Sequence, residues 1–160
     1  MTVPFRSTLG FILGVWCAFS IGAAPLPSPA GPELDLLARV NRERAAHHLM
    51  QLVASSELSD VARAHARDMA QRGYLAHIDP SGRSPLDRAQ QAGVSGFHLL
   101  AENIGASDVT HDRIESIVQA WLESPVHREN LLHPAFNTSG IGLERAANGR
   151  TVAVQLFASF

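Results

Sequence analysis

Two histidines and a set of acidic residues stand where the chain turns, outside its apolar runs. His77 precedes the turn-forming run 79–82, and His127 follows the helix-interrupting pair Ser124-Pro125. Glu102 lies in an otherwise apolar segment. Ionisable side chains gathered at the ends of rigid elements commonly build binding or catalytic sites. The sequence therefore predicts a polar site, while the chemistry of that site stays open.

Each of these side chains also has a structural interpretation. His77 and His127 are too far apart in sequence for local spacing to join them, and the zinc pattern of two histidines around a glutamate on one helix is absent. Either imidazole could bind backbone groups or cap a helix. A half-buried Glu102 must be paired. A nearby histidine would pair it and fix one imidazole tautomer, whereas a purely structural carboxylate would tie a strand end to a helix.

Several other chemistries lack support. No serine stands in a Gly-x-Ser-x-Gly elbow, and no phosphate loop or dinucleotide fingerprint occurs. His65 falls on an apolar helical stripe, which favours a core histidine. The chain has no lysine and a formal net charge of −2, so nucleic acid is not an expected partner.

The first residues have the features of a secretory signal peptide. Arg6 precedes an apolar run from Leu9 to Ile21, and small residues follow. We expect a signal peptide over residues 1–23, a Pro-rich linker over 24–31 and one domain over 32–160. Cys17, the only cysteine, would leave with the signal, so the mature chain would have no disulfide and no thiolate. No stable membrane span is expected in the mature chain, because a span needs about twenty apolar residues.

The spacing of apolar residues in the domain predicts helices first and a hairpin last. Asn148-Gly149 separates two segments of period two, a strong hairpin signal. Phe97 to Asn103 is a further expected strand. The fold class is therefore α+β, with an antiparallel sheet covered by helices. The expected helical segments are Pro32 to about His48, Glu57 to Arg72 after a serine cap, a short helix between Ser84-Pro85 and Gly93, a helix capped by Thr110, and a turn from Ser124-Pro125 through Leu132.

Ordered motifs across the domain resemble the CAP superfamily, also called SCP-like, in its short bacterial branch without cysteines. The resemblance covers nearly all of the chain from Leu36 and implies a three-layer α-β-α sandwich with one shallow cleft. The motifs are Asn41-Arg42-Glu43-Arg44, Ala62 to Ala70, Gly73 to Pro85 around His77-Ile78-Asp79-Pro80, Ala101-Glu102-Asn103-Ile104, Ala120 to Leu132 around Trp121 and His127, and the last strand to Phe157.

In this family the cleft is lined by two histidines and two acidic residues, and in several members it holds a divalent cation such as zinc. The resemblance assigns His77, Glu102 and His127 to three of these positions. The second glutamate position of many animal members holds Ser124 here. Glu123 is adjacent but would point roughly 100° away around a regular helix, and Asp79 is another candidate carboxylate.

Two functions follow from the resemblance. The first is a secreted, non-enzymatic module, periplasmic or extracellular, that binds a small or lipidic ligand or a cell-envelope partner and needs no cofactor. The second is a divalent-metal-dependent hydrolase, in which His77 and His127 bind the metal and Glu102 is the base. A third account gives these residues only a structural role. The family alone does not fix an activity.

Overall fold

The computed structural model describes residues 31–160. The expected signal peptide, Cys17 and all but the last residue of the expected linker lie outside the described residues. The described chain forms helices and strands in this order: α1 (Pro32–Ala46), β1 (Val53–Ala54), α2 (Ser56–Arg72), α3 (Pro85–Gln91), β2 (Leu99–Ser107), α4 (Arg113–Glu123), α5 (Pro125–Leu131), β3 (Thr138–Arg145) and β4 (Thr151–Ser159).

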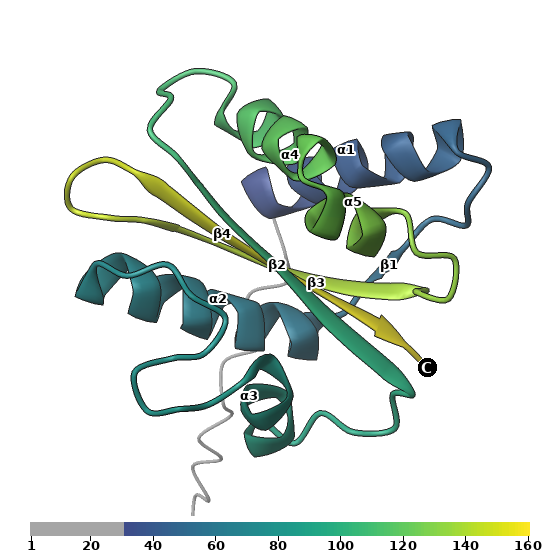
Figure 1. Ribbon diagram of the computed structural model, residues 1–160, viewed down its shortest axis with the longest axis horizontal. Coiled ribbons are helices and arrows are strands. Elements are labelled where there is room, and N and C mark those ends of the chain that lie inside the picture. Colours follow the sequence, from purple (N-terminus) through teal and green to yellow (C-terminus); the bar gives the residue numbers. More distant parts are fainter. Residues whose placement is uncertain (1–30) are drawn as a thin grey trace, which may run out of the picture.

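The strands form one sheet in the order β1-β3-β4-β2, which puts β2 at an edge (Figure 1). β4 pairs antiparallel with both β3 and β2 over their full lengths. The short β1 pairs parallel with β3. The sheet is therefore mixed and not antiparallel as expected, because β1 lies at the edge opposite to β2 and runs in the same direction as its neighbour β3.

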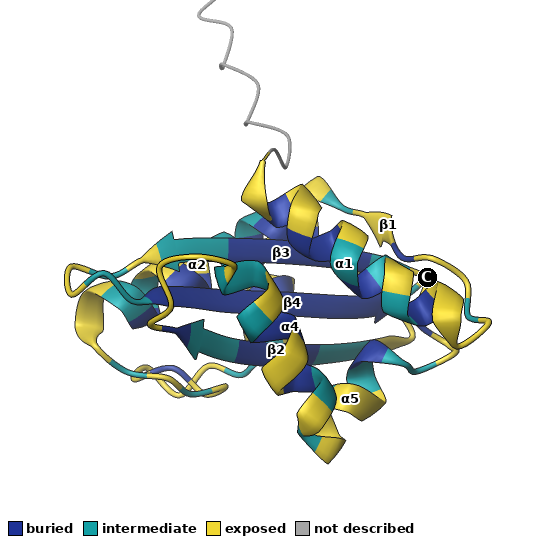
Figure 2. Cartoon of the chain, turned by 90° about the horizontal axis from the view of Figure 1, so that it is seen from above, coloured by how far each residue is buried: buried dark blue, intermediate teal, exposed yellow. Residues whose placement is uncertain are grey.

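Helices cover both faces of this sheet. Alternate residues of β4 point to opposite faces. Phe157 packs with α1, α4 and α5, whereas Leu156 packs with α2 and α3. β4 is consequently buried along almost its whole length between the two helical layers (Figure 2). This arrangement confirms the expected α+β class and the α-β-α layering.

Helix α2 lies directly against β3 because two glycines remove the side chains between them. A Cβ added at Gly140 would lie 2.2 Å from the backbone of Leu58, and one at Gly142 would lie 2.3 Å from the backbone of Ala62. The Gly140-Ile141-Gly142 segment thus serves helix–sheet packing. The close contact fixes α2, and with it the loop that leads to His77.

The ends of the elements agree closely with the sequence signals, and the main differences are at β2 and α4. Ser84 caps α3 in a capping box with Asp87, as expected. β2 continues beyond the expected end to Ser107. α4 begins after Asp112, which has a positive φ of 51°, and not after Thr110. The Ser107 hydroxyl accepts a hydrogen bond from the Val109 amide, which turns the chain away from the sheet before the helix can start.

The expected motif around Asn41 is structural. The Asn41 side chain bonds both backbone groups of Leu52 and so fixes the approach to β1. Arg44 is fully buried and donates to the carbonyls of Met50, Leu131 and Phe136. One guanidinium therefore joins the loop after α1 to the end of α5.

Candidate functional site

The candidate site lies at the edge strand β2, where the two helical layers meet. Neighbouring residues on a strand point to opposite faces. Glu102, paired with Leu156 of β4, points to the α2/α3 layer, and Asn103 points to the α4/α5 layer. Each binds a segment that carries one of the two histidines. We call His77, Arg88, Glu102 and His127 the histidine site.

A chain of charged hydrogen bonds forms one side of this site. His77 Nδ1 lies 2.8 Å from Glu102 Oε1, and Arg88 Nη2 lies 2.7 Å from Glu102 Oε2. The Glu102 side chain is 1% exposed, whereas the His77 side chain is 47% exposed. Because a carboxylate only accepts, the imidazole donates through Nδ1 and leaves Nε2 as an acceptor toward solvent when the ring is neutral.

Arg88 sets the position of this chain and was not predicted from the sequence. Its Nη1 donates to the carbonyls of His77 and Arg83, so the same guanidinium holds the loop and the carboxylate. The capping box of α3 fixes the helix that carries it. The sequence did hold one indication of such a residue, because a half-buried Glu102 needs a charged or hydrogen-bonding partner. Several arginines of the chain would have met that need equally well.

The other side of the site is held through the backbone of α5. Asn103 is fully buried, and its amide nitrogen donates to the His127 carbonyl at 2.9 Å. Its oxygen accepts from Asn130 Nδ2, also at 2.9 Å. Burial, and then the nearby charge of His77, lower the pKa of His127 below its ordinary value. The two imidazoles are therefore within electrostatic range, and His127 favours its neutral form.

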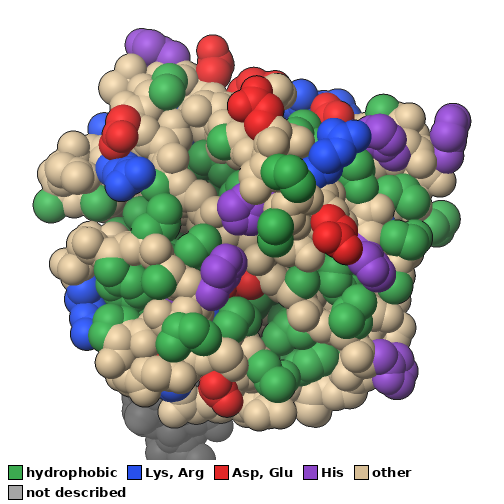
Figure 3. Space-filling view, in the orientation of Figure 1, with side chains coloured by type: hydrophobic (Ala, Val, Ile, Leu, Met, Phe, Trp, Pro, Cys, Tyr) green, Lys and Arg blue, Asp and Glu red, His purple; other side chains and the backbone are tan. Residues whose placement is uncertain are grey.

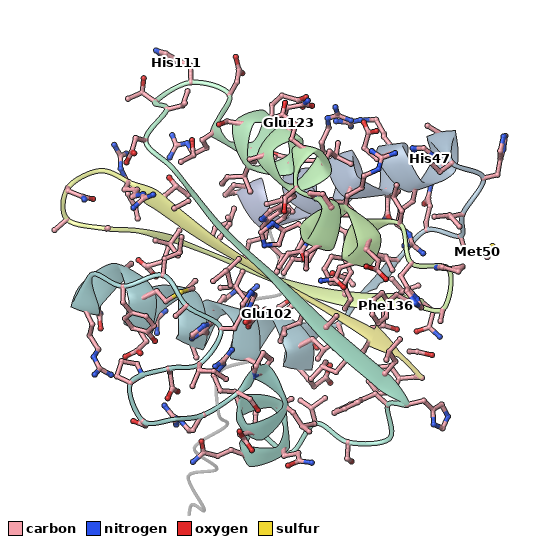
Figure 4. All side chains as sticks on the ribbon, viewed as in Figure 1. His47, Met50, Glu102, His111, Glu123 and Phe136 are labelled. Atoms are coloured by element: carbon pink, nitrogen blue, oxygen red, sulfur yellow. The ribbon has the colours of Figure 1, made fainter. Side chains whose placement is uncertain are left out.

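The remaining expected cleft residues lie elsewhere or have other roles. Asp79 accepts from the backbone of Ser81 and Arg83 and from Arg83 Nε, so its carboxylate closes the 79–83 turn. Burial alone would raise the pKa of Asp79, but these hydrogen bonds lower it. Ser124 is the joint between α4 and α5. Glu123 is exposed, accepts from Gln119, and lies far from Glu102 on the outer side of α4 (Figure 4).

The side chains of the histidine site leave few free ligand atoms for a divalent cation. Residues 31–160 contain no group of three or more His, Cys, Asp or Glu side chains placed to hold a metal ion. Both oxygens of Glu102 are bonded, one of them to a guanidinium. The ring nitrogens left for a metal are His77 Nε2 and those of His127, which is a poor set for a zinc centre of three protein ligands.

Exposed apolar side chains lie beside each histidine in the sequence. Ile78 is 52% exposed and Val126 is 69% exposed. Figure 3 shows histidine and hydrophobic side chains gathered near the middle of the face on which β2 lies. The segments that carry the two histidines thus also expose apolar side chains, and the Arg88–Glu102 pair is neutral as a whole.

The comparisons identify the family of this chain. The CAP family, described as the cysteine-rich secretory protein family, matches residues 37–157. The chain belongs to this family. It is 34% identical over 110 residues to the uncharacterized protein YkwD of Bacillus subtilis (strain 168), a match that covers 69% of this chain and 41% of YkwD. The chain thus spans less than half the length of that relative.

Solved structures agree with this assignment. An extracellular protein containing an SCP domain from Bacillus anthracis (strain Ames) has a TM-score of 0.71 and 29% identity, over 84% of this chain and 45% of that one. An outer surface protein from Borrelia burgdorferi also has a TM-score of 0.71, at 23% identity, over 79% of this chain and 90% of that one. The second likeness shows the fold alone. No helix within residues 31–160 is long and apolar enough to cross a membrane.

Proposed function

We propose that this CAP domain is a secreted, non-enzymatic binding module whose histidine site takes a small or lipidic ligand, free or presented by the cell envelope. The observation that carries the proposal is the Arg88–Glu102–His77 chain, which fixes one exposed imidazole and turns its second nitrogen outward. A ring held in this way loses little conformational freedom when a ligand binds.

The chemistry around this ring favours a ligand with an apolar body and a hydrogen-bonding end. His77 Nε2 accepts when its ring is neutral, and neutral His127 has one donor and one acceptor nitrogen. Ile78 and Val126, which adjoin the two histidines in the sequence, are exposed and apolar. The paired charges of Arg88 and Glu102 leave no net charge that would demand an ionic ligand.

Secretion is the second part of the proposal. Residues 1–23 have the pattern of a signal peptide. The Bacillus anthracis relative is described as extracellular and the Borrelia protein as an outer surface protein. Amino-terminal sequencing of the protein recovered from medium or envelope tests this directly. A mature chain that starts just after Ala23 supports the proposal, and a retained Met1 in the cytoplasm contradicts it.

Ligand binding is tested on the full secreted protein. Lipids carried through purification are extracted and identified by mass spectrometry, and uptake of a fluorescent fatty acid is titrated. We expect uptake to fall at least about tenfold in the His77→Ala, His127→Ala double variant. His47→Ala with His111→Ala is the matched control, because both histidines are exposed and lie away from the site (Figure 4). Equal uptake by both variants, or none by the parent, contradicts the proposal.

Calorimetry with zinc distinguishes the alternative, a metal-dependent hydrolase. A peptidase activity that chelators abolish, together with zinc binding that disappears in the same double variant, would replace the binding module with that enzyme. We expect neither result, because Glu102 is already bonded at both oxygens and the described residues provide no three-ligand group.

A further inference from the structure

Strand β2 leaves one of its two sides unpaired. Within residues 31–160, β4 pairs with one side of β2 and no strand lies on the other (Figure 2). Proteins commonly protect a free edge with a very short strand, a proline or an outward charge, because an open edge pairs with other chains. The opposite edge strand, β1, has only two residues. β2 has nine, includes no proline or basic residue, and its one charged side chain, Glu102, is bonded to Arg88.

The hydrogen bonds of β3 determine which backbone groups of β2 face outward. The Ser139 carbonyl accepts from the Ser55 amide, and the amides of Ile141 and Leu143 donate to side chains of α2 and α1. Odd-numbered residues of β3 thus face away from β4, and its even-numbered residues bond β4, because the backbone groups of successive residues point to opposite sides of a strand. In both pairings of β4, even-numbered residues stand opposite even-numbered ones. Odd-numbered residues of β4 therefore bond β2, and the even-numbered residues of β2 face outward.

The outward backbone groups belong to Leu100, Glu102, Ile104 and Ala106. The Ile104 carbonyl accepts from Trp121 Nε1 at 2.9 Å, which agrees with its outward direction. No other hydrogen bond reaches these outward groups in the part of the chain that the structure describes. The stretch 100–104 consequently offers three amide donors and two free carbonyls, repeated about every 7 Å along the strand.

Solvent reaches this edge, although the approach is narrow. Glu102 is 7% exposed as a residue whereas its side chain is 1% exposed, so most of its exposed area belongs to the backbone. Leu100 and Ala106 are half-buried. The segment of His77 flanks β2 on one face, and α5 flanks it on the other. A single extended chain therefore fits this edge better than a second folded domain does.

We propose that the outer edge of β2 binds an extended peptide, which adds a strand to the sheet through the backbone groups of residues 100–104. Donors and acceptors that alternate at strand spacing match the backbone of another extended chain, and main-chain bonds of this kind supply affinity. The absence of an unpaired charge on β2 favours an uncharged peptide. Because the bonds come from the backbone, the pairing is independent of the ligand proposed for the histidine site.

The pairing also predicts where the side chains of the peptide point. Residues that stand opposite each other on neighbouring strands point to the same face of the sheet. The peptide residue opposite Glu102 would therefore point to the layer that carries His77, and the residues on either side of it would point to the layer that carries His127. One bound strand would thus present side chains to both histidine segments.

The test is amide hydrogen exchange of the isotope-labelled full secreted chain, followed by nuclear magnetic resonance. The probe is a blocked peptide of alternating threonine and valine, about six residues long. Every second amide of the probe is N-methylated, which leaves one edge free for β2 and prevents the probe from pairing with itself. We expect slower exchange at Leu100, Glu102 and Ile104, and little change at Ala101 and Asn103, whose amides face β4.

The same peptide methylated at every amide is the control, and it should leave the exchange unchanged. Equal slowing by both peptides, no slowing by the probe, or slowing that does not alternate along β2 overturns the proposal. Slower exchange that follows protein concentration alone also overturns it, because a second copy of the chain would then occupy the edge.

A proline on β2 removes one outward donor and leaves the bonds to β4 in place. Leu100→Pro deletes the outward N–H, a change that edge strands tolerate. Leu100→Ala shortens the same side chain but keeps the N–H, and is the matched comparison. We expect the probe to bind at least about tenfold more weakly to Leu100→Pro than to Leu100→Ala. Equal binding by the two folded variants overturns the proposal, and the pair of peptides decides the question on the unchanged protein if the proline variant does not fold.

Discussion

The two histidines of the site are positioned by opposite means. His77 is held by its ring, since Nδ1 bonds Glu102 and the carboxylate in turn bonds Arg88. His127 is held by its backbone, because Asn103 binds its carbonyl. Neither ring nitrogen of His127 has a hydrogen bond within residues 31–160. One imidazole is thus fixed in orientation and tautomer by a hydrogen bond, and the other ring has no such bond among the described residues.

The two imidazole rings are therefore held to different degrees in the site. The ring of His77 is held for one geometry of partner, whereas no hydrogen bond in residues 31–160 holds the ring of His127. The backbone of both segments is nevertheless fixed by adjacent residues of one edge strand, Glu102 and Asn103. The site therefore combines a fixed frame with one ring, that of His127, which no hydrogen bond among the described residues holds.

The largest expected decrease in the free energy of unfolding follows substitution of Arg88, which supports the His77 side of the site. Arg88→Met removes the cation from a carboxylate that is 1% exposed, and it also removes the donor to the His77 and Arg83 carbonyls. Loss of one partner from a buried pair costs about 3–5 kcal/mol. We expect that decrease in the free energy of unfolding, measured with urea.

A matched control separates this effect from the loss of any arginine. Arg67 is 60% exposed and lies 3.5 Å from Glu144. Exposed pairs contribute at most about 1 kcal/mol, so Arg67→Met should change the unfolding free energy by less than that. If both methionine variants unfold at the same denaturant concentration, Arg88 is not the anchor of the site.

Substitution of Asn103, which binds the His127 segment, is expected to lower the free energy of unfolding by a smaller amount. Asn103→Ala removes the hydrogen bonds to the His127 carbonyl and to Asn130. Unmade buried hydrogen bonds cost about 1–3 kcal/mol. The loss should concentrate in α5, where amide hydrogen exchange should accelerate more than in α3. Equal acceleration in both helices would show that Asn103 does not act on α5 alone.

The fold was largely predictable because its signals are local. The serine caps, the capping box of Ser84 and the Asn148-Gly149 turn act within a few residues, and each appears at its expected place. β1 was not predicted, since two residues show no periodicity and pair only because β3 lies beside them. Its parallel pairing with β3 makes the sheet mixed.

The sequence indicated which histidines and which glutamate belong to the site, but it did not indicate the hydrogen bonds that hold them. The family pattern brought His77, Glu102 and His127 together, and the structure places all three at β2. Arg88 was missed because its contacts span 11 and 14 residues, and no local pattern selects one arginine among many. Glu123 was a further candidate for the cleft, but its position on α4 leaves its side chain exposed to solvent.

Removal of each ring in turn tests the contrast between the histidines directly. His77→Ala leaves Glu102 Oε1 buried without its donor, at a cost of about 1 kcal/mol. His127→Ala removes a ring that makes no hydrogen bond in the described structure and should cost less than about 0.5 kcal/mol. Urea unfolding of both variants measures the difference. The reverse order would show that the ring of His127, not its backbone, holds α5.

The smallest expected effect is electrostatic and concerns the pKa of His127. Burial and the charge of His77 both lower the pKa of His127 below its ordinary value of 6.5. The unfolded chain therefore takes up a proton at this residue first, and its contribution to stability is complete above pH 6.5 and lost as the pH falls below it. His77→Gln removes the repulsion and should raise the pKa of His127, measured by nuclear magnetic resonance. The pKa of His65 is set by burial, Glu102 and Arg88, and serves as the internal reference. An unchanged His127 pKa in this variant would mean that the two rings do not face one another.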